Sequence, residues 1–138
     1  MSTPIIDFHI HLIKYDPPSN SLNKLMDHTF PSWDEYKAFE AKFADPDNFV
    51  RMMKENGVDY GVILAEYAPL TTGIATHEMV ADFCKGHKEL IPFATVNPHM
   101  DEDPIATIKK YCGDMGFKGI KFYPTYNHFY PNEAKMYP

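Results

Sequence analysis

Alternating apolar and polar residues define the first element of the chain. Residues 4–12 (PIIDFHIHL) follow a period of two, which is typical of a β-strand. The pattern predicts a strand with one apolar face and one polar face. The apolar set is Ile6, Phe8 and Ile10, and the polar set is Asp7, His9 and His11.

Three further apolar runs predict strands, and helix signals lie between them. The runs are 58–65 (VDYGVILA), 90–97 (LIPFATVN) and 117–124 (FKGIKFYP). Ser32 and Glu35 form a capping-box pattern, and Asp45-Pro46 is a helix start with Gly57 as its stop. We expect helices over 32–43, 46–56, 76–88 and 104–112. We expect a loop over 13–31, and over 125–138 a loop with the first turn of a further helix.

Strands that alternate with helices predict parallel pairing, and therefore an α/β fold. Two architectures compete at this point: an open doubly wound sheet, and part of a closed (β/α)₈ barrel. No glycine-rich phosphate loop follows the first strand, which disfavours a dinucleotide-binding version of the open sheet.

Composition narrows the function classes only slightly. The 138 residues have the size of one domain, and the formal net charge of −6 argues against a nucleic-acid partner. No apolar run approaches the length of a membrane span, and no secretory leader pattern is visible. Two cysteines, Cys84 and Cys112, do not make a disulfide framework. We expect a cytoplasmic protein with reduced thiols, no membrane and no nucleic acid.

His9 and His11 end the first predicted strand. Residues two apart on a strand share a face and lie about 6.5–7 Å apart along the backbone, so two imidazoles can converge on one ion. Active sites of parallel α/β proteins lie at the carboxyl ends of the strands. The pair therefore favours a metal site, while two histidines that merely hydrogen-bond at a strand end remain the alternative. A catalytic zinc site uses three protein ligands, so the pair would be only part of one.

The chain also resembles a known family. DFHIHL (7–12) resembles the first-strand metal motif of the amidohydrolase superfamily, and GFKGIKFYP (116–124) looks like the fourth strand of its amidohydrolase-related branch. That branch includes the aminocarboxymuconate-semialdehyde decarboxylase-like enzymes. Similar segments complete the resemblance in order along the chain: KENGVDYGVIL (54–64), IPFATVNP (91–98) and PTYNHFYPNEAKMYP (124–138).

The resemblance implies a (β/α)₈ barrel with a divalent metal, zinc being the ion we expect, held in part by His9 and His11. It implies hydrolysis of an amide, ester or lactone, or decarboxylation of a carboxylic acid, on a small molecule. The family's other ligands and its acid–base residues lie on strands five, six and eight. Only four strands are predicted here, so we expect residues 1–138 to be the N-terminal half of the barrel domain, with no catalytic residue assigned.

Lys121 is the candidate for substrate binding. It shares a strand face with Tyr123 and should point into the barrel near its mouth. It could bind an anionic substrate or, when carbamylated, bridge two metals, as in other branches of the superfamily. It could also be a structural lysine paired with Asp7 or Glu66.

Other residues are weaker candidates for a functional site. Asp7 could orient a ligating histidine or make a cap or salt bridge, and Glu66 faces the same mouth. His99 and His128 lie in loops, where histidines are usually solvated. We expect surface or helix positions for the remaining histidines, and packing as the default for the aromatics: His28, His77, His87, Trp33, Tyr123, Tyr126 and Tyr130.

Two classes of function therefore remain open. The first is a metal-dependent hydrolase or decarboxylase that is active only in a complete barrel. The second is a non-catalytic half-barrel fragment or assembly module. A half-barrel exposes two sheet edges and an unfilled interior, so we expect closure by a homo-oligomer or by the C-terminal half.

Overall fold

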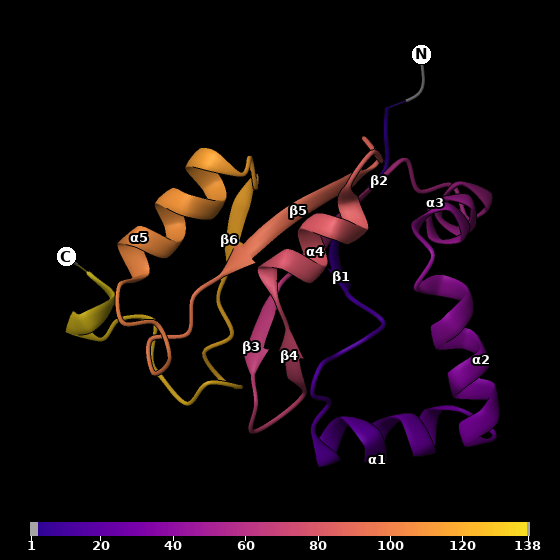
Figure 1. Ribbon diagram of the computed structural model, residues 1–138, viewed down its shortest axis with the longest axis horizontal. Helices are drawn as coiled ribbons and strands as arrows, with labels where there is room; N and C mark the ends of the chain where they lie inside the picture. The colour runs from indigo at the N-terminus through magenta and orange to yellow at the C-terminus, as the bar shows by residue number, and fades with distance from the viewer. Residues whose placement is uncertain (1–2, 138) are drawn as a thin grey trace.

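The computed structural model describes residues 3–137, and its main feature is a four-stranded parallel sheet (Figure 1). The strand order β1-β2-β5-β6 follows the chain without a reversal. This order confirms the α/β class and matches half of a (β/α)₈ barrel rather than a doubly wound sheet. The strands are β1 (Ile6–His11), β2 (Tyr60–Leu64), β5 (Leu90–Thr95) and β6 (Gly119–Lys121).

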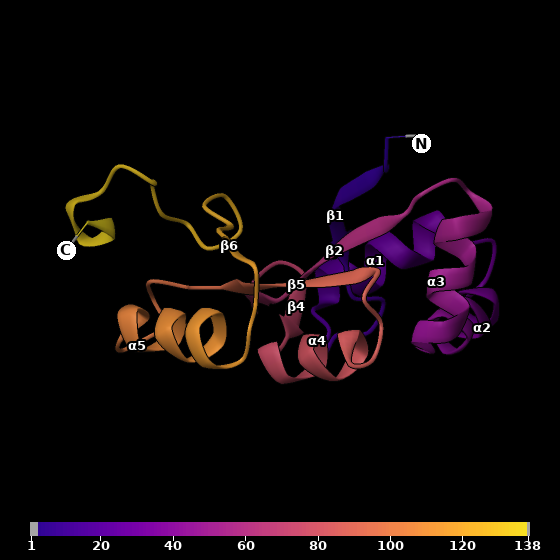
Figure 2. The same cartoon turned by 90° about the horizontal axis from the view of Figure 1, so that it is seen from above.

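Two of the helices lie on one face of this sheet. Figure 2 shows α4 (His77–Cys84) and α5 (Pro104–Ile108) on the same side of the strands. The core lies between the helices and the sheet, and its fully buried members include Ile63 and Val80. The opposite face corresponds to the barrel interior. None of the helices within residues 3–137 is long and apolar enough to cross a bilayer.

The helix starts follow the predicted capping. In α2 (Trp33–Phe43) the Ser32 hydroxyl accepts a hydrogen bond from the Glu35 amide at 3.2 Å. In α3 (Pro46–Glu55) the Asp45 carboxylate accepts from the Asp47 amide at 2.9 Å. Gly57 follows α3 with φ +76°, the left-handed conformation that ends a helix. Both predicted helices are therefore confirmed.

Local elements differ from the sequence prediction in several places. Residues 20–29 form helix α1 (Asn20–Thr29) instead of a loop, with the Ser19 hydroxyl as its N-cap. A short hairpin of β3 (Glu66–Ala68) and β4 (Gly73–Ala75) follows β2. Helix α4 ends at Cys84, four residues before the predicted end, and Gly86 follows with φ +83°. Beyond α5, a π-helical turn covers Lys109–Asp114, and a 3₁₀ turn covers Ala134–Met136.

A bulge in β1 breaks the predicted alternation. Asp7 pairs with Gly61 and Ile10 with Ile63, so three steps along β1 match two along β2. Ile10 lies on the helix side, packed against the core. Phe8 instead contacts Phe93 across the sheet, with ring centroids 5.3 Å apart and an edge-on geometry. The prediction that Phe8 and Ile10 share a face is therefore wrong, because the extra residue turns Phe8 into the barrel interior.

Gly73 is a backbone position that no other residue fits. Its φ is +122°, and an added Cβ would lie 2.5 Å from the Pro17 carbonyl oxygen. We expect Gly73→Ala to lower the free energy of unfolding by about 2 kcal/mol, measured by urea denaturation. Gly113→Ala is the matched control, because nothing lies within 4 Å of its added Cβ. Equal stability of the two variants would contradict the conclusion that only glycine fits at position 73.

Candidate metal centre

The two histidines of β1 face one another at the carboxyl end of the strand. Their Nε2 atoms are 2.9 Å apart, and their ring centroids are 4.9 Å apart. The bulge at Phe8 leaves His9 and His11 on the interior face. The Asp7 carboxylate accepts a hydrogen bond from the His9 backbone amide at 3.0 Å and so fixes the strand backbone there. The structure thus brings the predicted pair together.

A buried carboxylate contacts the Nδ1 side of the His11 ring. Glu66, at the start of β3, has no exposed surface, and its Oε2 lies 2.7 Å from Nδ1 of His11. The Tyr15 hydroxyl donates to the same Oε2 at 2.8 Å. The Thr72 hydroxyl donates to Oε1. Three donors from three segments of the chain therefore converge on one carboxylate.

This network determines which ring nitrogen of His11 carries the hydrogen. Burial alone would raise the pKa of Glu66, but the hydrogen bonds from His11, Thr72 and Tyr15 bring the pKa below its ordinary value. An ionised carboxylate can only accept, so Nδ1 of His11 carries the hydrogen and donates it. The lone pair of His11 is then on Nε2, the atom that faces His9. A carboxylate that fixes the tautomer of a histidine in this way is typical of metal ligands.

His9 is held in its neutral form by its surroundings. Partial burial, and then the positive charge of Lys121, lower the pKa of His9. Neutral imidazole is the form that binds metals. Lys121 and both histidines line one pocket of about 180 Å³, together with Tyr123 and Tyr126.

The donor chemistry of this pocket fits a divalent ion. Two Nε2 atoms 2.9 Å apart can both reach one zinc ion, because each bond would be about 2.0–2.1 Å long. Glu66 contacts the far side of the His11 ring and is not a third ligand. Within residues 3–137, no group of three His, Cys, Asp or Glu side chains is placed to hold a metal. The described residues therefore contain a facing pair of histidines but no complete metal site.

Comparison with known proteins identifies the family. The Amidohydrolase family model matches residues 6–138. The chain belongs to this family. Amidohydrolases are enzymes that often bind a metal ion, and the match confirms the resemblance to the branch with the aminocarboxymuconate-semialdehyde decarboxylase-like enzymes. Searches of curated proteins and of solved structures give no match.

Lys121 lines the same pocket as the two histidines, and among the described residues it does not make the ion pair expected of a structural lysine. It lies on β6 beside Tyr123, with Nζ 5.5 Å from the centroid of the Tyr123 ring. In the part of the chain that the structure describes, Lys121 makes no salt bridge within 4.0 Å, so the predicted pairing with Asp7 or Glu66 is absent. Its ammonium group is therefore available to the pocket.

The other candidate histidines lie away from this centre. His99 and His128 line a separate pocket of about 400 Å³ with Asn97 and Asn127. His87 pairs with Asp47 at 2.9 Å. Cys84 and Cys112 are free thiols. Sequence reasoning missed Tyr15 and Thr72, which lie in connecting segments with no motif of their own.

His77 is a helix residue, as expected, but it is buried at the start of α4, and we expect it to make stability depend on pH. Its Nε2 accepts from the Thr95 amide at 3.1 Å, and its ring stacks on Tyr111 at 3.8 Å. Burial lowers its pKa below the ordinary 6.5. The unfolded chain therefore binds the proton more tightly than the folded chain does. The free energy of unfolding should be at its maximum above about pH 6.5 and should decrease as the pH is lowered below that value.

Urea denaturation at about pH 7.5 and about pH 5.5 measures this effect. The loss of stability at the lower pH should be smaller in His77→Gln than in the unchanged chain. An identical loss in both proteins would contradict the assignment to His77.

Proposed function

We propose that this chain supplies the first two ligands of a metal-dependent amidohydrolase that acts on a small molecule. The observation that carries the proposal is the pair of Nε2 atoms 2.9 Å apart, with His11 anchored through Nδ1 to Glu66. A divalent ion, for which zinc suits the imidazole donors, supplies Lewis-acid chemistry that polarises an oxygen and acidifies water. The reaction is hydrolysis of an amide, ester or lactone, or decarboxylation of a carboxylic acid.

The chain's own residues have distinct tasks in this proposal. His9 and His11 offer neutral nitrogen donors, and Glu66 holds the second ring in one tautomer and orientation. Lys121 presents a positive charge to the same pocket, where it can bind an anionic group of the substrate. Tyr123 also lines this pocket, and its hydroxyl donates a hydrogen bond to the Ala65 carbonyl at 3.2 Å, which holds the ring in place.

The remaining ligands must come from outside this half-barrel. A catalytic zinc site uses three protein ligands and an open position. The sheet has β1 and β6 as its edges, and both are free to pair with further strands. We expect those strands to belong to a further part of the polypeptide or to a second copy of the chain, and the chain alone to be inactive.

Turnover by the completed barrel tests the proposal. The barrel should hydrolyse an ester or lactone, or decarboxylate an aromatic acid, and lose this activity with a chelator and with His9→Ala. Lys121→Met should raise KM for anionic substrates and leave KM for neutral ones unchanged. Turnover that survives both the chelator and His9→Ala would overturn the proposal.

A non-catalytic assembly module is the second candidate, and exposed apolar side chains favour it. Phe8 on edge strand β1 is 65% exposed, and Ile6 is 49% exposed. Such a strand is a template for pairing with another chain. A stable dimer in light scattering that binds no zinc would favour this role over the enzyme.

A further inference from the structure

The segment that follows β1 is joined to the β3–β4 hairpin by backbone hydrogen bonds. We call residues 15–19 the strap. The Asp16 amide donates to the Ile74 carbonyl at 2.7 Å, and the Ser19 amide donates to the Thr72 carbonyl at 3.0 Å. An antiparallel bridge lies between these two bonds. The strap therefore extends the hairpin by one short antiparallel segment.

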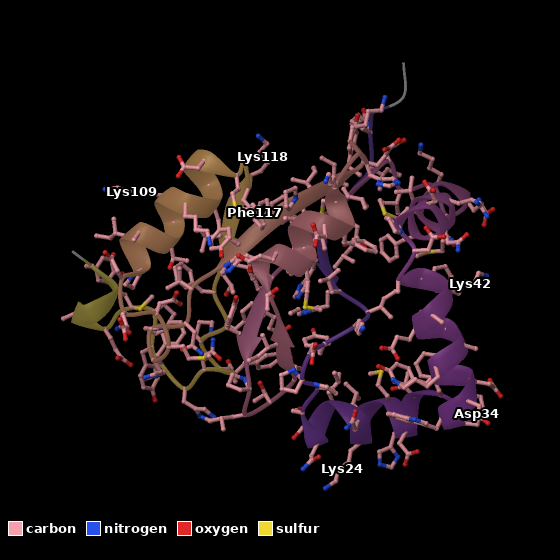
Figure 3. All side chains as sticks on the ribbon, in the orientation of Figure 1. Lys24, Asp34, Lys42, Lys109, Phe117 and Lys118 are labelled. Carbon is pink, nitrogen blue, oxygen red and sulfur yellow. The ribbon has the colours of Figure 1, made fainter. Side chains whose placement is uncertain are left out.

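The strap ends where α1 begins, because Ser19 is the N-cap of that helix. The Ser19 hydroxyl also donates to the Thr71 carbonyl in the turn of the hairpin. Figure 1 shows the tip of the hairpin beside the start of α1. Figure 3 shows Lys24 of the same helix pointing away from the rest of the molecule. The contact with the hairpin is therefore what fixes the start of α1.

One side chain from the strap and one from the hairpin turn reach the buried carboxylate of Glu66. Tyr15 and Thr72 are both half-buried. The Tyr15 hydroxyl donates to Oε2 of Glu66 at 2.8 Å, and the Thr72 hydroxyl donates to Oε1. Because each carboxylate oxygen has a donor from a different segment, the plane of the carboxylate is fixed as well as its position.

Tyr15 also contacts His11 directly. The Tyr15 oxygen lies 3.1 Å from Nδ1 of His11, and that nitrogen lies 2.7 Å from Oε2 of Glu66. With a hydrogen on Nδ1, the ring donates to the carboxylate while the Tyr15 oxygen presents a lone pair to the same hydrogen. Without that hydrogen, two acceptors would face each other at 2.7 Å. The three groups together therefore favour the tautomer that has its lone pair on Nε2.

We propose that Tyr15 and Thr72 are positioning residues of the metal centre, which act through Glu66 on the tautomer and orientation of His11. The inference rests on the proposed function, because His11 is the ligand whose Nε2 they direct toward the ion. Metal affinity then depends on the contact between the strap and the hairpin, although neither Tyr15 nor Thr72 is itself a ligand. Groups that orient a ligand in this way change metal affinity by roughly 10–100-fold.

Long-range ¹H–¹⁵N NMR of His11 in the metal-free chain of 138 residues tests this role without any metal. Tyr15→Phe keeps the ring but removes one donor to Glu66 and the oxygen that faces Nδ1. The ratio of the Nε2-protonated to the Nδ1-protonated tautomer should rise about fivefold, which corresponds to one hydrogen bond. Tyr67→Phe is the matched control, because Tyr67 follows Glu66 in β3 but its ring contacts His77, with centroids 5.1 Å apart.

Zinc titration of the chain tests the second positioning residue. Thr72→Val removes the hydroxyl and keeps the shape of the side chain, whereas Thr72→Ser keeps the hydroxyl. We expect Thr72→Val and Tyr15→Phe each to weaken zinc binding about fivefold, and Thr72→Ser to bind zinc as the unchanged chain does. Thr71→Val is the matched control, because the Thr71 hydroxyl donates to the Ala68 carbonyl rather than to Glu66.

The two measurements separate the positioning role from the proposed function. An unchanged chain that binds no zinc at His9 and His11 would contradict the proposed function, while the tautomer of His11 in Tyr15→Phe still decides the positioning role. The same tautomer ratio in Tyr15→Phe and Tyr67→Phe would overturn that role, and so would a loss of stability in urea with no change at His11. If Thr72→Val does not fold, the result for Tyr15→Phe decides alone.

Discussion

Replacing His11 by alanine should weaken zinc binding by about 100-fold or more. Loss of a residue that only supports a ligand costs roughly 10–100-fold in metal affinity, and loss of the ligand itself costs more. His11 is also the only one of the pair that the structure ties to a buried carboxylate, at 2.7 Å. Its removal therefore takes away a donor and its orientation together. Competition with a chromophoric chelator measures the change.

Two variants complete that experiment. His9→Ala should weaken zinc binding by a similar factor, because it removes the facing nitrogen. His28→Ala is the matched control, since His28 lies exposed in the last turn of α1 and far along the chain from the pair. Equal zinc affinity in His11→Ala and His28→Ala would mean that the bound ion lies elsewhere.

Replacing Glu66 by alanine should cost about 3 kcal/mol of unfolding free energy, the largest effect on stability that we expect. The carboxylate is fully buried and accepts from His11, Tyr15 and Thr72. Its loss leaves three donors without their acceptor, each worth about 1 kcal/mol. The His11 side chain is 33% exposed, so water can replace part of its lost bond. Urea denaturation gives the value.

Glu66→Gln separates stability from metal binding. The amide oxygen can still accept hydrogen bonds, so we expect a smaller loss of stability than in Glu66→Ala. The negative charge that fixes the His11 tautomer is gone, so zinc affinity should still fall by about tenfold. If Glu66→Gln binds zinc as tightly as the unchanged chain, Glu66 has a structural role alone.

The sheet could be predicted from the sequence because its strands are continuous apolar runs with helix signals between them. Helix α1 was missed, although Ser19 followed by Leu22, Leu25 and Met26 has the spacing of a capped helix. The polar residues around this pattern favoured the prediction of a loop over 13–31. The pocket that Leu22, Leu25 and Met26 line depends on this helix, so it was missed as well.

Other features depend on pairing between distant segments. The alternation over β1 is regular in the sequence, and only its register with β2 creates the bulge at Phe8. Glu66 lies 55 residues from His11, and Tyr15 and Thr72 join them only through the β3–β4 hairpin and the segment before α1. Sequence spacing predicted the two histidines as ligands, and this remains a prediction. It could not predict what orients them.

Long-range ¹H–¹⁵N NMR of the histidine rings tests the central claim most directly. The chain has seven histidines, and each ring reports which of its nitrogens carries a hydrogen. Before metal is added, His11 should show a protonated Nδ1 and an unprotonated Nε2. One equivalent of zinc should shift Nε2 of His9 and of His11 and leave the other five rings unchanged. Shifts spread over all the histidines, or none at His9 and His11, would contradict the account.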